Sequence, residues 1–290
     1  MTRASLPKSC AIPPGLYRGS LFAIDDWLCH GHDTPRGHEE WCGEDRVVVT
    51  RRGVWDLEVE GHAQRCDPTA VTFWPRETPY RVRHPIGGRD QCTVFRLTAA
   101  GRDALVDAGG TIPGRDARET RSRAIDGPTH FLHRRALDAA RSPGDPLAIE
   151  EAGTMFLQRI SAGHALTSRR GTQPAVDRAL DFMAAEFRRP LTIAQVAQAA
   201  AVSPFHLSRL FRRTVGTSLY RHVLALRLRE ALERVAEADG PEPLATLALD
   251  LGFASHSHFT DAFRAEYGVP PSRVRQQPRR TRRSRRASRA

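Results

Sequence analysis

The sequence predicts an α+β protein with a β-rich N-terminal region and a helical C-terminal region. Three observations favour this fold class: short runs rich in Val, Phe, Trp and Tyr between residues 46 and 97, helical periodicity from about residue 100, and a helical pattern at 202–216 that recurs at 252–275. The chain has 290 residues, of which 40% are hydrophobic, so two domains with separate cores are expected.

The predicted strands occupy 46–50, 54–59, 70–74, 80–84 and 92–97, and turn-forming segments separate them. In the second strand, apolar and acidic residues alternate from Trp55 to Val59, as in a half-buried strand. Strands at this spacing predict a small barrel or sandwich. The aromatic side chains of the region are expected in the core, with the lining of an effector pocket as the alternative; they are Trp55, Phe73, Trp74, Tyr80 and Phe95.

Helices are predicted at 101–109, 128–141 and 146–166. They either cover the β region or pair between subunits, since their apolar faces fit both arrangements. The polar segment 167–174 contains Gly and Pro and is the expected domain junction. We therefore expect a β domain at 1–100, a helical covering or dimerisation segment at 101–170, a helical domain at 174–275 and a tail at 276–290.

The C-terminal domain contains one unit twice. Each copy begins with a Ser that fits an N-cap, where its hydroxyl accepts from a backbone N–H, and ends at a Gly that fits the left-handed C-terminal position. A shorter helix precedes each copy, at 192–200 and 244–251, so both copies follow the helix-turn-helix plan. An offset of 52 residues aligns Ser203 with Ser255, Leu207 with Phe259, Phe211 with Phe263, Arg212 with Arg264 and Gly216 with Gly268.

The segment 219–238 separates the two units and carries Leu and Val at helical spacing. A helix of this length spans about 30 Å. Successive major-groove segments on one face of a duplex are roughly 34 Å apart. The predicted helix is therefore long enough to present both units to adjacent segments of one DNA site.

The stretches LTIAQVAQAAAVSPFHLSRLFRRTVGTSLYRHVLALRLREA and LATLALDLGFASHSHFTDAFRAEYGVPPSRVR resemble the DNA-binding domain of the AraC/XylS family of bacterial transcription regulators. The resemblance covers about residues 174–275 and includes the closing G-x-x-P and the final Arg. It implies two helix-turn-helix units on a long connecting helix, sequence-specific binding of double-stranded DNA, and contact with RNA polymerase. Helix-turn-helix geometry also occurs in proteins that bind no DNA, but two copies with polar faces favour DNA binding.

The resemblance is weaker in residues 1–170, where strands followed by helices look like the cupin-like β barrel of many such regulators. It implies that this region binds a small-molecule effector or forms a homodimer. The same resemblance implies a transcriptional activator, although repression fits the sequence equally well.

By matching positions, the resemblance also implies which side chains touch DNA. Base contacts are expected from the exposed N-terminal half of each second helix, namely Phe205, His206, Ser208 and Arg209 in the first unit and His256, Ser257 and Thr260 in the second. An Arg suits a bidentate contact with guanine, and a Phe suits the methyl group of thymine. Phosphate contacts are expected from Ser203, Arg212, Arg213, Arg264 and Arg275.

The second unit departs from the first at one position, because Asp261 stands where the first unit has Arg209. A carboxylate there either accepts from a cytosine amine or pairs with Arg264 three residues later. The first unit is therefore expected to be the stronger reader of sequence.

The formal net charge of +11 lies mostly in the tail. Seven Arg and no acidic residue occupy 276–290, so the other residues carry 11 minus 7, or +4. Such a composition does not build a core. The tail either adds salt-sensitive attraction to phosphates or serves as a solubilising segment.

The five cysteines, Cys10, Cys29, Cys42, Cys66 and Cys92, include no CxxC pair and are expected to be free thiols. A metal site is the alternative, with Cys29, His30, His32, His84 and Cys92 as candidates and His38, Glu39 and Glu40 close in sequence. Of these, His30, His32 and His84 are partly similar to the metal-binding set of cupin enzymes. The glycine frame of that motif is absent, and the spacing matches no zinc ribbon. No metal and no cofactor is therefore expected; a redox role for Cys29 or Cys92 is a further alternative.

These observations together predict a cytoplasmic transcription regulator that is not an enzyme. The sequence contains no apolar run of about 18 residues and no signal-peptide pattern, so no membrane association is expected. Two other functions compete with this prediction: a metal-dependent cupin-type enzyme fused to a DNA-binding domain, and a nucleoid protein that binds DNA through its Arg-rich tail.

Overall fold

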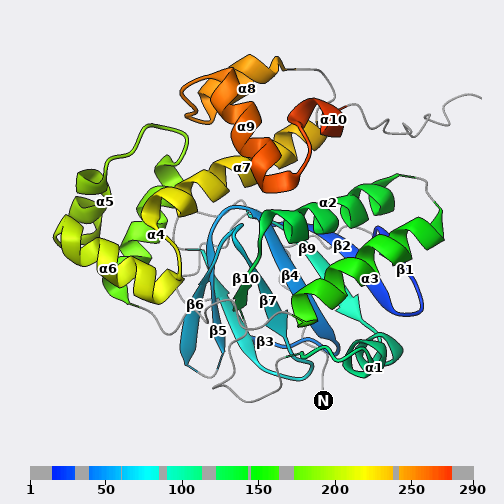
Figure 1. The fold of residues 1–290 in the computed structure, drawn as a ribbon. Helices are drawn as coiled ribbons and strands as arrows, with labels where there is room; N and C mark the ends of the chain where they lie inside the picture. Colours follow the sequence, from blue (N-terminus) through cyan, green and yellow to red (C-terminus); the bar gives the residue numbers. More distant parts are fainter. Residues whose placement is uncertain are drawn as a thin grey trace, which may run out of the picture.

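The computed structural model describes residues 15–29, 39–59, 61–84, 90–112, 122–142, 145–162, 173–237 and 242–275. His30, His32, His38, Cys10 and the Arg-rich tail lie outside these residues. A sheet-rich N-terminal part and a helical C-terminal part make up the molecule (Figure 1), which confirms the α+β fold class.

The described strands form two antiparallel sheets. The larger sheet has the order β1-β2-β9-β4-β7-β10, and the smaller sheet has the order β3-β8-β5-β6. No closed barrel is formed by the described strands, so the cupin-like barrel is not confirmed. The larger sheet comprises β1 (Tyr17–Arg18), β2 (Phe22–Leu28), β9 (Gln91–Leu97), β4 (Asp45–Arg52), β7 (Ala70–Trp74) and β10 (Ser122–Ala124); the smaller comprises β3 (Glu39–Glu40), β8 (Tyr80–Arg83), β5 (Trp55–Val59) and β6 (His62–Cys66).

Both faces of the larger sheet are buried, because one packs on helices and the other on the smaller sheet. In β4, Val47 and Val49 belong to the core beneath the helices, while Val48 belongs to the core between the sheets. The side chains of β9 also alternate between the two cores, since Phe95 lies in the core beneath the helices and Val94 in the core between the sheets. This explains why β4 is a continuous apolar run, VVV, whereas β5 alternates between buried and half-buried residues.

Three helices cover the outer face of the larger sheet: α1 (Ala99–Asp107), α2 (Gly127–Arg141) and α3 (Pro146–Ala162). Thr98 caps α1 and Asp126 caps α2, each by accepting from a backbone N–H. Phe156 of α3 is fully buried against Phe95 of β9, with ring centroids 5.1 Å apart. Of the two predicted roles, covering the β region is the one that the structure shows.

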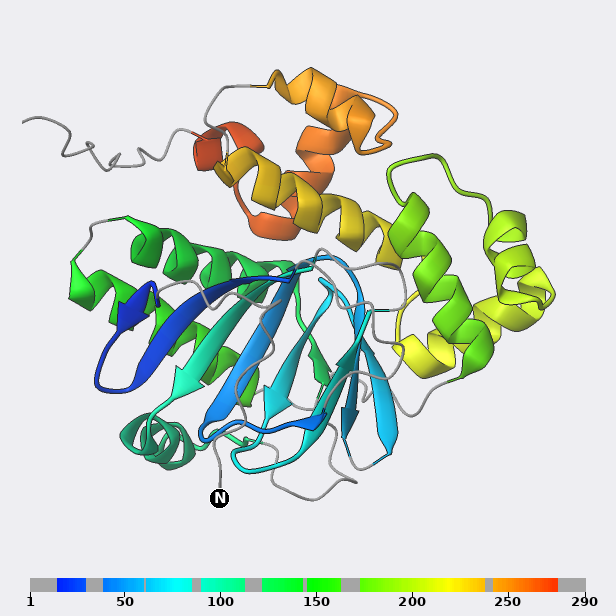
Figure 2. The same cartoon turned by 180° about the vertical axis from the view of Figure 1, so that it is seen from behind.

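The C-terminal part contains seven helices in its described residues, and Figure 2 shows two groups at opposite ends of α7. Each group has its own hydrophobic core, and α7 contributes to both: Val223 belongs to the first core and Leu232 to the second. One helix therefore holds both units. The helices are α4 (Pro174–Glu186), α5 (Ile193–Ala200), α6 (Pro204–Val215), α7 (Leu219–Glu237), α8 (Leu244–Asp250), α9 (His256–Tyr267) and α10 (Pro271–Arg275).

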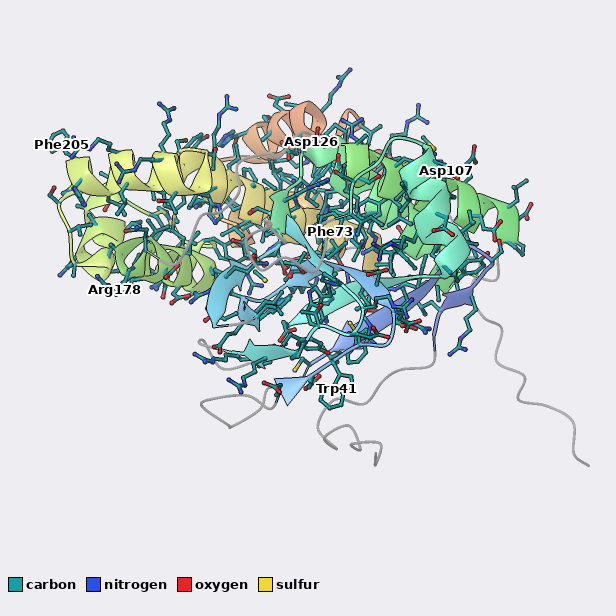
Figure 3. All side chains as sticks on the ribbon, turned by 90° about the horizontal axis from the view of Figure 1, so that it is seen from below. Trp41, Phe73, Asp107, Asp126, Arg178 and Phe205 are labelled. Carbon is teal, nitrogen blue, oxygen red and sulfur yellow. The ribbon has the colours of Figure 1, made fainter. Side chains whose placement is uncertain are left out.

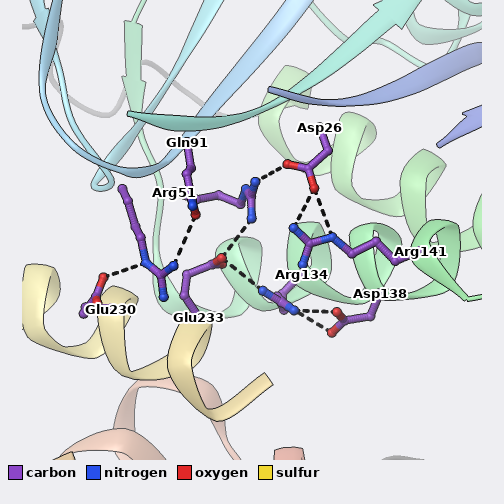
Figure 4. A network of polar contacts seen from close by, with 9 residues as sticks. Asp26, Arg51, Gln91, Arg134, Asp138, Arg141, Glu230 and Glu233 are labelled. Atoms are coloured by element: carbon purple, nitrogen blue, oxygen red, sulfur yellow. Dashed lines mark hydrogen bonds and ion pairs between the residues drawn. The ribbon is translucent and has the colours of Figure 1, made fainter. Parts of the chain in front are cut away.

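Helix α7 also contacts the N-terminal part through buried charges. Glu233, which is fully buried, contacts Arg51 of β4 at 3.1 Å and Arg134 of α2 at 3.0 Å. The two arginines reach further carboxylates, since Arg51 pairs with Asp26 and Arg134 pairs with Asp138 (Figure 4). A continuous set of charges thus joins β2, β4, α2 and α7.

A second buried contact joins the same parts at Arg229 of α7. Its guanidinium donates to the carbonyl oxygen of Ile125 at 3.0 Å, and to Glu266 and the hydroxyl of Tyr267 in α9, both at 3.1 Å. The start of α2 also lies close to the end of α9, because a Cβ on Gly127 would come 2.2 Å from the carbonyl oxygen of Glu266. The second helix-turn-helix unit is therefore docked on the N-terminal part.

Candidate nucleic-acid interface

The two repeated helices, α6 and α9, begin and end as the sequence predicts. The hydroxyl of Ser203 accepts from the backbone N–H of His206 at 3.3 Å, and that of Ser255 accepts from His258 at 3.1 Å. Each helix ends at a Gly in the left-handed region, with φ of 81° at Gly216 and 77° at Gly268. These contacts fix the direction in which each helix presents its first turns.

The turns that precede α6 and α9 differ. Helix α5 has a capping box between Thr192 and Gln195, and it ends at Ala201, which has φ of 56°. Helix α8 ends before Gly252, which has φ of 77°. Three residues separate α5 from α6 and five separate α8 from α9, and each turn contains one of these left-handed residues.

Helix α6 has a clear division between a buried and an exposed face. Leu207, Leu210, Phe211 and Val215 are buried in the first core. The predicted base-contacting side chains are all exposed, and Phe205 is 90% exposed at the end of the helix (Figure 3). The predicted phosphate-contacting residues Ser203, Arg212 and Arg213 are also exposed. The structure therefore gathers the residues of the first unit on one surface.

Helix α9 buries Phe259, Phe263 and Tyr267 and exposes its first turn. His256 and Ser257 are exposed, while Thr260 is half-buried, with its hydroxyl 3.5 Å from His256 Nε2. Of the predicted phosphate contacts, Arg264 is exposed and Arg275 is half-buried.

Asp261 is exposed, and no ion pair between Asp261 and Arg264 is present in the described part of the chain. A contact of Asp261 with a base is the alternative that stays a prediction.

A groove of about 1120 Å³ runs between the two units. Phe205, Ser208, Arg209 and Arg212 of α6 line it on one side, and His258 of α9 lines it on the other. The sequence prediction missed His258, although the 52-residue offset pairs it with His206, which the prediction did include. The repeat itself was the signal that could have found it.

Arg227, in the middle of α7, connects the two units at this groove. Its guanidinium donates to the carbonyl oxygens of Phe187 at 2.7 Å and Arg189 at 2.8 Å, which precede α5, and to that of Gly252 at 2.8 Å, which precedes α9. Burial lowers the pKa of Arg227 from its usual value. No pattern in the sequence distinguished this Arg from those on the exposed face, yet it fixes the spacing of the two units.

Comparison with known proteins agrees with this geometry. A family model described as a helix-turn-helix domain matches residues 196–277. The chain is 31% identical over 141 residues to the HTH-type transcriptional regulator GlxA of Rhizobium meliloti, where the match covers 43% of each chain. It is 29% identical over 109 residues to the multiple antibiotic resistance protein MarA of Escherichia coli, covering 37% of this chain and 84% of MarA. The helix-turn-helix region is therefore similar to that of AraC/XylS-family regulators.

Among solved structures, this chain matches that of ToxT K231A from Vibrio cholerae with 12% identity and a TM-score of 0.38, over 88% of this chain and 97% of ToxT. The chain spans less than half the length of GlxA. In the described residues, every helix is too short or too polar to cross a lipid bilayer.

Proposed function

We propose that this chain is a sequence-specific transcription regulator of the AraC/XylS family that places α6 and α9 in adjacent major-groove segments of one DNA site. One observation carries the proposal: two capped helices with exposed first turns stand at opposite ends of α7. Helix α7 has 19 residues and so spans about 28 Å, which is close to the roughly 34 Å between successive groove segments.

In this proposal the first unit supplies most of the sequence discrimination. Arg209 is exposed on the same face as Phe205 and Ser208 and is able to donate two hydrogen bonds to one guanine. Phe205 packs on a thymine methyl group, which gives a reason for a 90% exposed aromatic ring. Arg212, Arg213 and Arg264 bind phosphates and set the register of the protein on the duplex. His256, Ser257 and Thr260 are the proposed readers in the second unit.

The N-terminal sheets act as a cupin-like sensing unit that responds to a small effector or forms a homodimer. Their charged contact with α7 through Arg51 and Glu233 supports a regulatory link, because α7 holds both helix-turn-helix units. An effector changes DNA binding only if it binds two arrangements of this interface with different affinity. Activation through contact with RNA polymerase is part of the same proposal, whereas the enzyme alternative is not favoured, since GlxA is named a transcriptional regulator.

Binding-site selection from random DNA, followed by affinity measurement, tests the proposal. The full chain should enrich one motif with two conserved segments about 10 base pairs apart, and Arg209→Ala should relax one position of that motif. Arg76→Ala is the matched control, because Arg76 is an exposed Arg of the N-terminal part whose guanidinium pairs with exposed Glu77. Enrichment of no motif would contradict the proposal.

Deletion of residues 276–290 separates this function from a nucleoid role. A truncated chain that keeps its motif is a sequence-specific regulator. A truncated chain that loses all DNA affinity is a protein that binds DNA through its Arg-rich tail.

A further inference from the structure

Three side chains with metal-binding atoms meet at one edge of the two sheets. Cys29 directly follows β2, Asp90 directly precedes β9, and His84 directly follows β8 of the smaller sheet. The backbone N–H of Cys29 donates to the carbonyl oxygen of Asp90 at 2.9 Å, which extends the β2–β9 pairing and places the two side chains next to each other. One potential ligand atom from each residue lies within 4.8 Å of the other two.

The atoms match the preferences of a thiophilic divalent cation. A thiolate sulfur, an imidazole nitrogen and a carboxylate oxygen all bind Zn²⁺, at about 2.3, 2.0 and 2.1 Å respectively. Tetrahedral geometry at these bond lengths places ligand atoms roughly 3.3 to 3.7 Å from one another. Separations of up to 4.8 Å therefore close on a common ion with small side-chain rotations.

The immediate contacts of these groups favour a shared ion. His84 Nε2 lies 2.7 Å from Asp90 Oδ1, so an imidazole from one sheet and a carboxylate from the other already meet. Binding of a common ion takes the place of this contact and requires the two atoms to move apart by roughly 0.6 Å.

Burial and charge also favour binding of a cation by these three residues. Cys29 is 7% exposed, and the side chains of His84 and Asp90 are 3% and 10% exposed. A buried carboxylate is costly unless a cation neutralises it. A divalent cation bound by all three residues neutralises the carboxylate and the thiolate that forms when Cys29 binds it.

We propose that Cys29, His84 and Asp90 bind one Zn²⁺-class cation, which links the larger sheet to the smaller one at this edge. Cys92 lies just behind the three ligands, with its Sγ 3.7 Å from Asp90 Oδ2, and it holds the carboxylate rather than the ion. Three protein ligands leave a fourth position for an exchangeable ligand, as in zinc sites that are not purely structural. The site uses two of the sequence candidates, Cys29 and His84, and adds Asp90, which the sequence reasoning did not include.

Cobalt titration of the full chain tests the proposal, because Co²⁺ takes the place of Zn²⁺ and gives a thiolate-to-metal charge-transfer band only when sulfur is a ligand. The protein is first treated with a chelator and kept reduced. We expect the band to saturate at one Co²⁺ per chain, to disappear on addition of one equivalent of Zn²⁺, and to be lost in Cys29→Ser. His84→Ala and Asp90→Asn should each weaken Zn²⁺ binding at least 10-fold.

The control variant is Cys42→Ser, since Cys42 is another buried thiol of the same domain whose Sγ contacts the carbonyl oxygen of Pro75 instead. It should keep the band and the affinity. Absence of a charge-transfer band in the unmodified chain would overturn the proposal, and so would equal loss of the band in Cys42→Ser and Cys29→Ser. Circular dichroism of each variant shows whether loss of the band reflects loss of the fold, and the result for the unmodified chain does not depend on any variant.

Discussion

Replacing Glu233 by Gln tests how strongly the buried charges hold α7 against the N-terminal part. Glu233 is fully buried, and the side chains of its partners Arg51 and Arg134 are 2% and 1% exposed. The two guanidinium groups keep the pKa of Glu233 well below its usual range despite burial, so the group is ionised at neutral pH. The isosteric amide keeps the volume of the side chain but removes the charge that both arginines share.

The magnitude follows from what remains after the substitution. Breaking a buried ion pair costs about 3 to 5 kcal/mol. Arg51 keeps Asp26 and Arg134 keeps Asp138 as partners, so we expect a value at the lower end, about 3 kcal/mol. At about 2 to 4 °C per kcal/mol, the midpoint of thermal unfolding should fall by roughly 6 to 12 °C.

Differential scanning calorimetry of the full chain measures this change. Glu230→Gln is the matched control, one turn before Glu233 in α7. Because Glu230 pairs with the more exposed Arg52 and Arg188, loss of its charge should lower the unfolding midpoint far less. A midpoint for Glu233→Gln within about 1 °C of the unmodified chain would refute the reasoning, since it would mean that the charges do not stabilise the interface.

Three further outcomes follow from the same structure. Arg209→Ala should cost about 1 to 3 kcal/mol of DNA-binding free energy at one base position. Arg213→Ala should weaken binding to all sequences alike and make the affinity less dependent on salt concentration. Titrations on single-base variants of the selected site distinguish these effects. Ser203→Ala should lower the unfolding free energy by about 1 kcal/mol, as measured by urea denaturation, because it removes the cap of α6. Burial lowers the pKa of His133 to about 3, below its unfolded value near 6.5, so the unfolded state binds the extra proton between these values and stability is lost as pH falls below about 6.5. Urea denaturation should show that the loss of stability between pH 7 and 5 is about 2 kcal/mol larger for the unmodified chain than for His133→Gln, and an equal loss in both would contradict the assignment of a neutral, buried imidazole.

The helix-turn-helix units were predictable from the sequence because their determinants are local. Ser203 and Gly216 act within one helix, and the apolar positions of that helix have the 3.6-residue period of its buried face. The strand predictions from residue 46 onward succeeded for the same reason, since alternation and β-branched residues are local signals.

Strand β2 was not predicted, because its sequence FAIDDWL contains two adjacent acidic residues that disfavour a buried strand. In the structure, arginines from other strands and helices pair with both carboxylates. Asp25 is 4% exposed and pairs with Arg96 of β9 at 2.5 Å, and Asp26 pairs with Arg51 of β4 and with Arg141 of α2 at 2.6 Å. None of these pairings leaves a pattern in the sequence.

The interface between the N-terminal and C-terminal parts also could not be predicted from the sequence. Arg51, Arg134, Arg229 and Glu233 are charged residues that the sequence places on helix and strand surfaces, and they are buried only because those surfaces meet. The same holds for Cys29, His84 and Asp90, which lie far apart along the chain and come together through the pairing of β2 with β9 and the position of β8.

Footprinting of the full chain on its selected DNA site tests the central claim most directly, because it reports on both units in one experiment. The account predicts two protected major-groove segments on one face of the duplex, centred about 10 base pairs apart. It also predicts that Arg209→Ala alters protection in one segment and leaves the other in place. Protection of a single segment, or of every sequence to the same extent, would contradict the account.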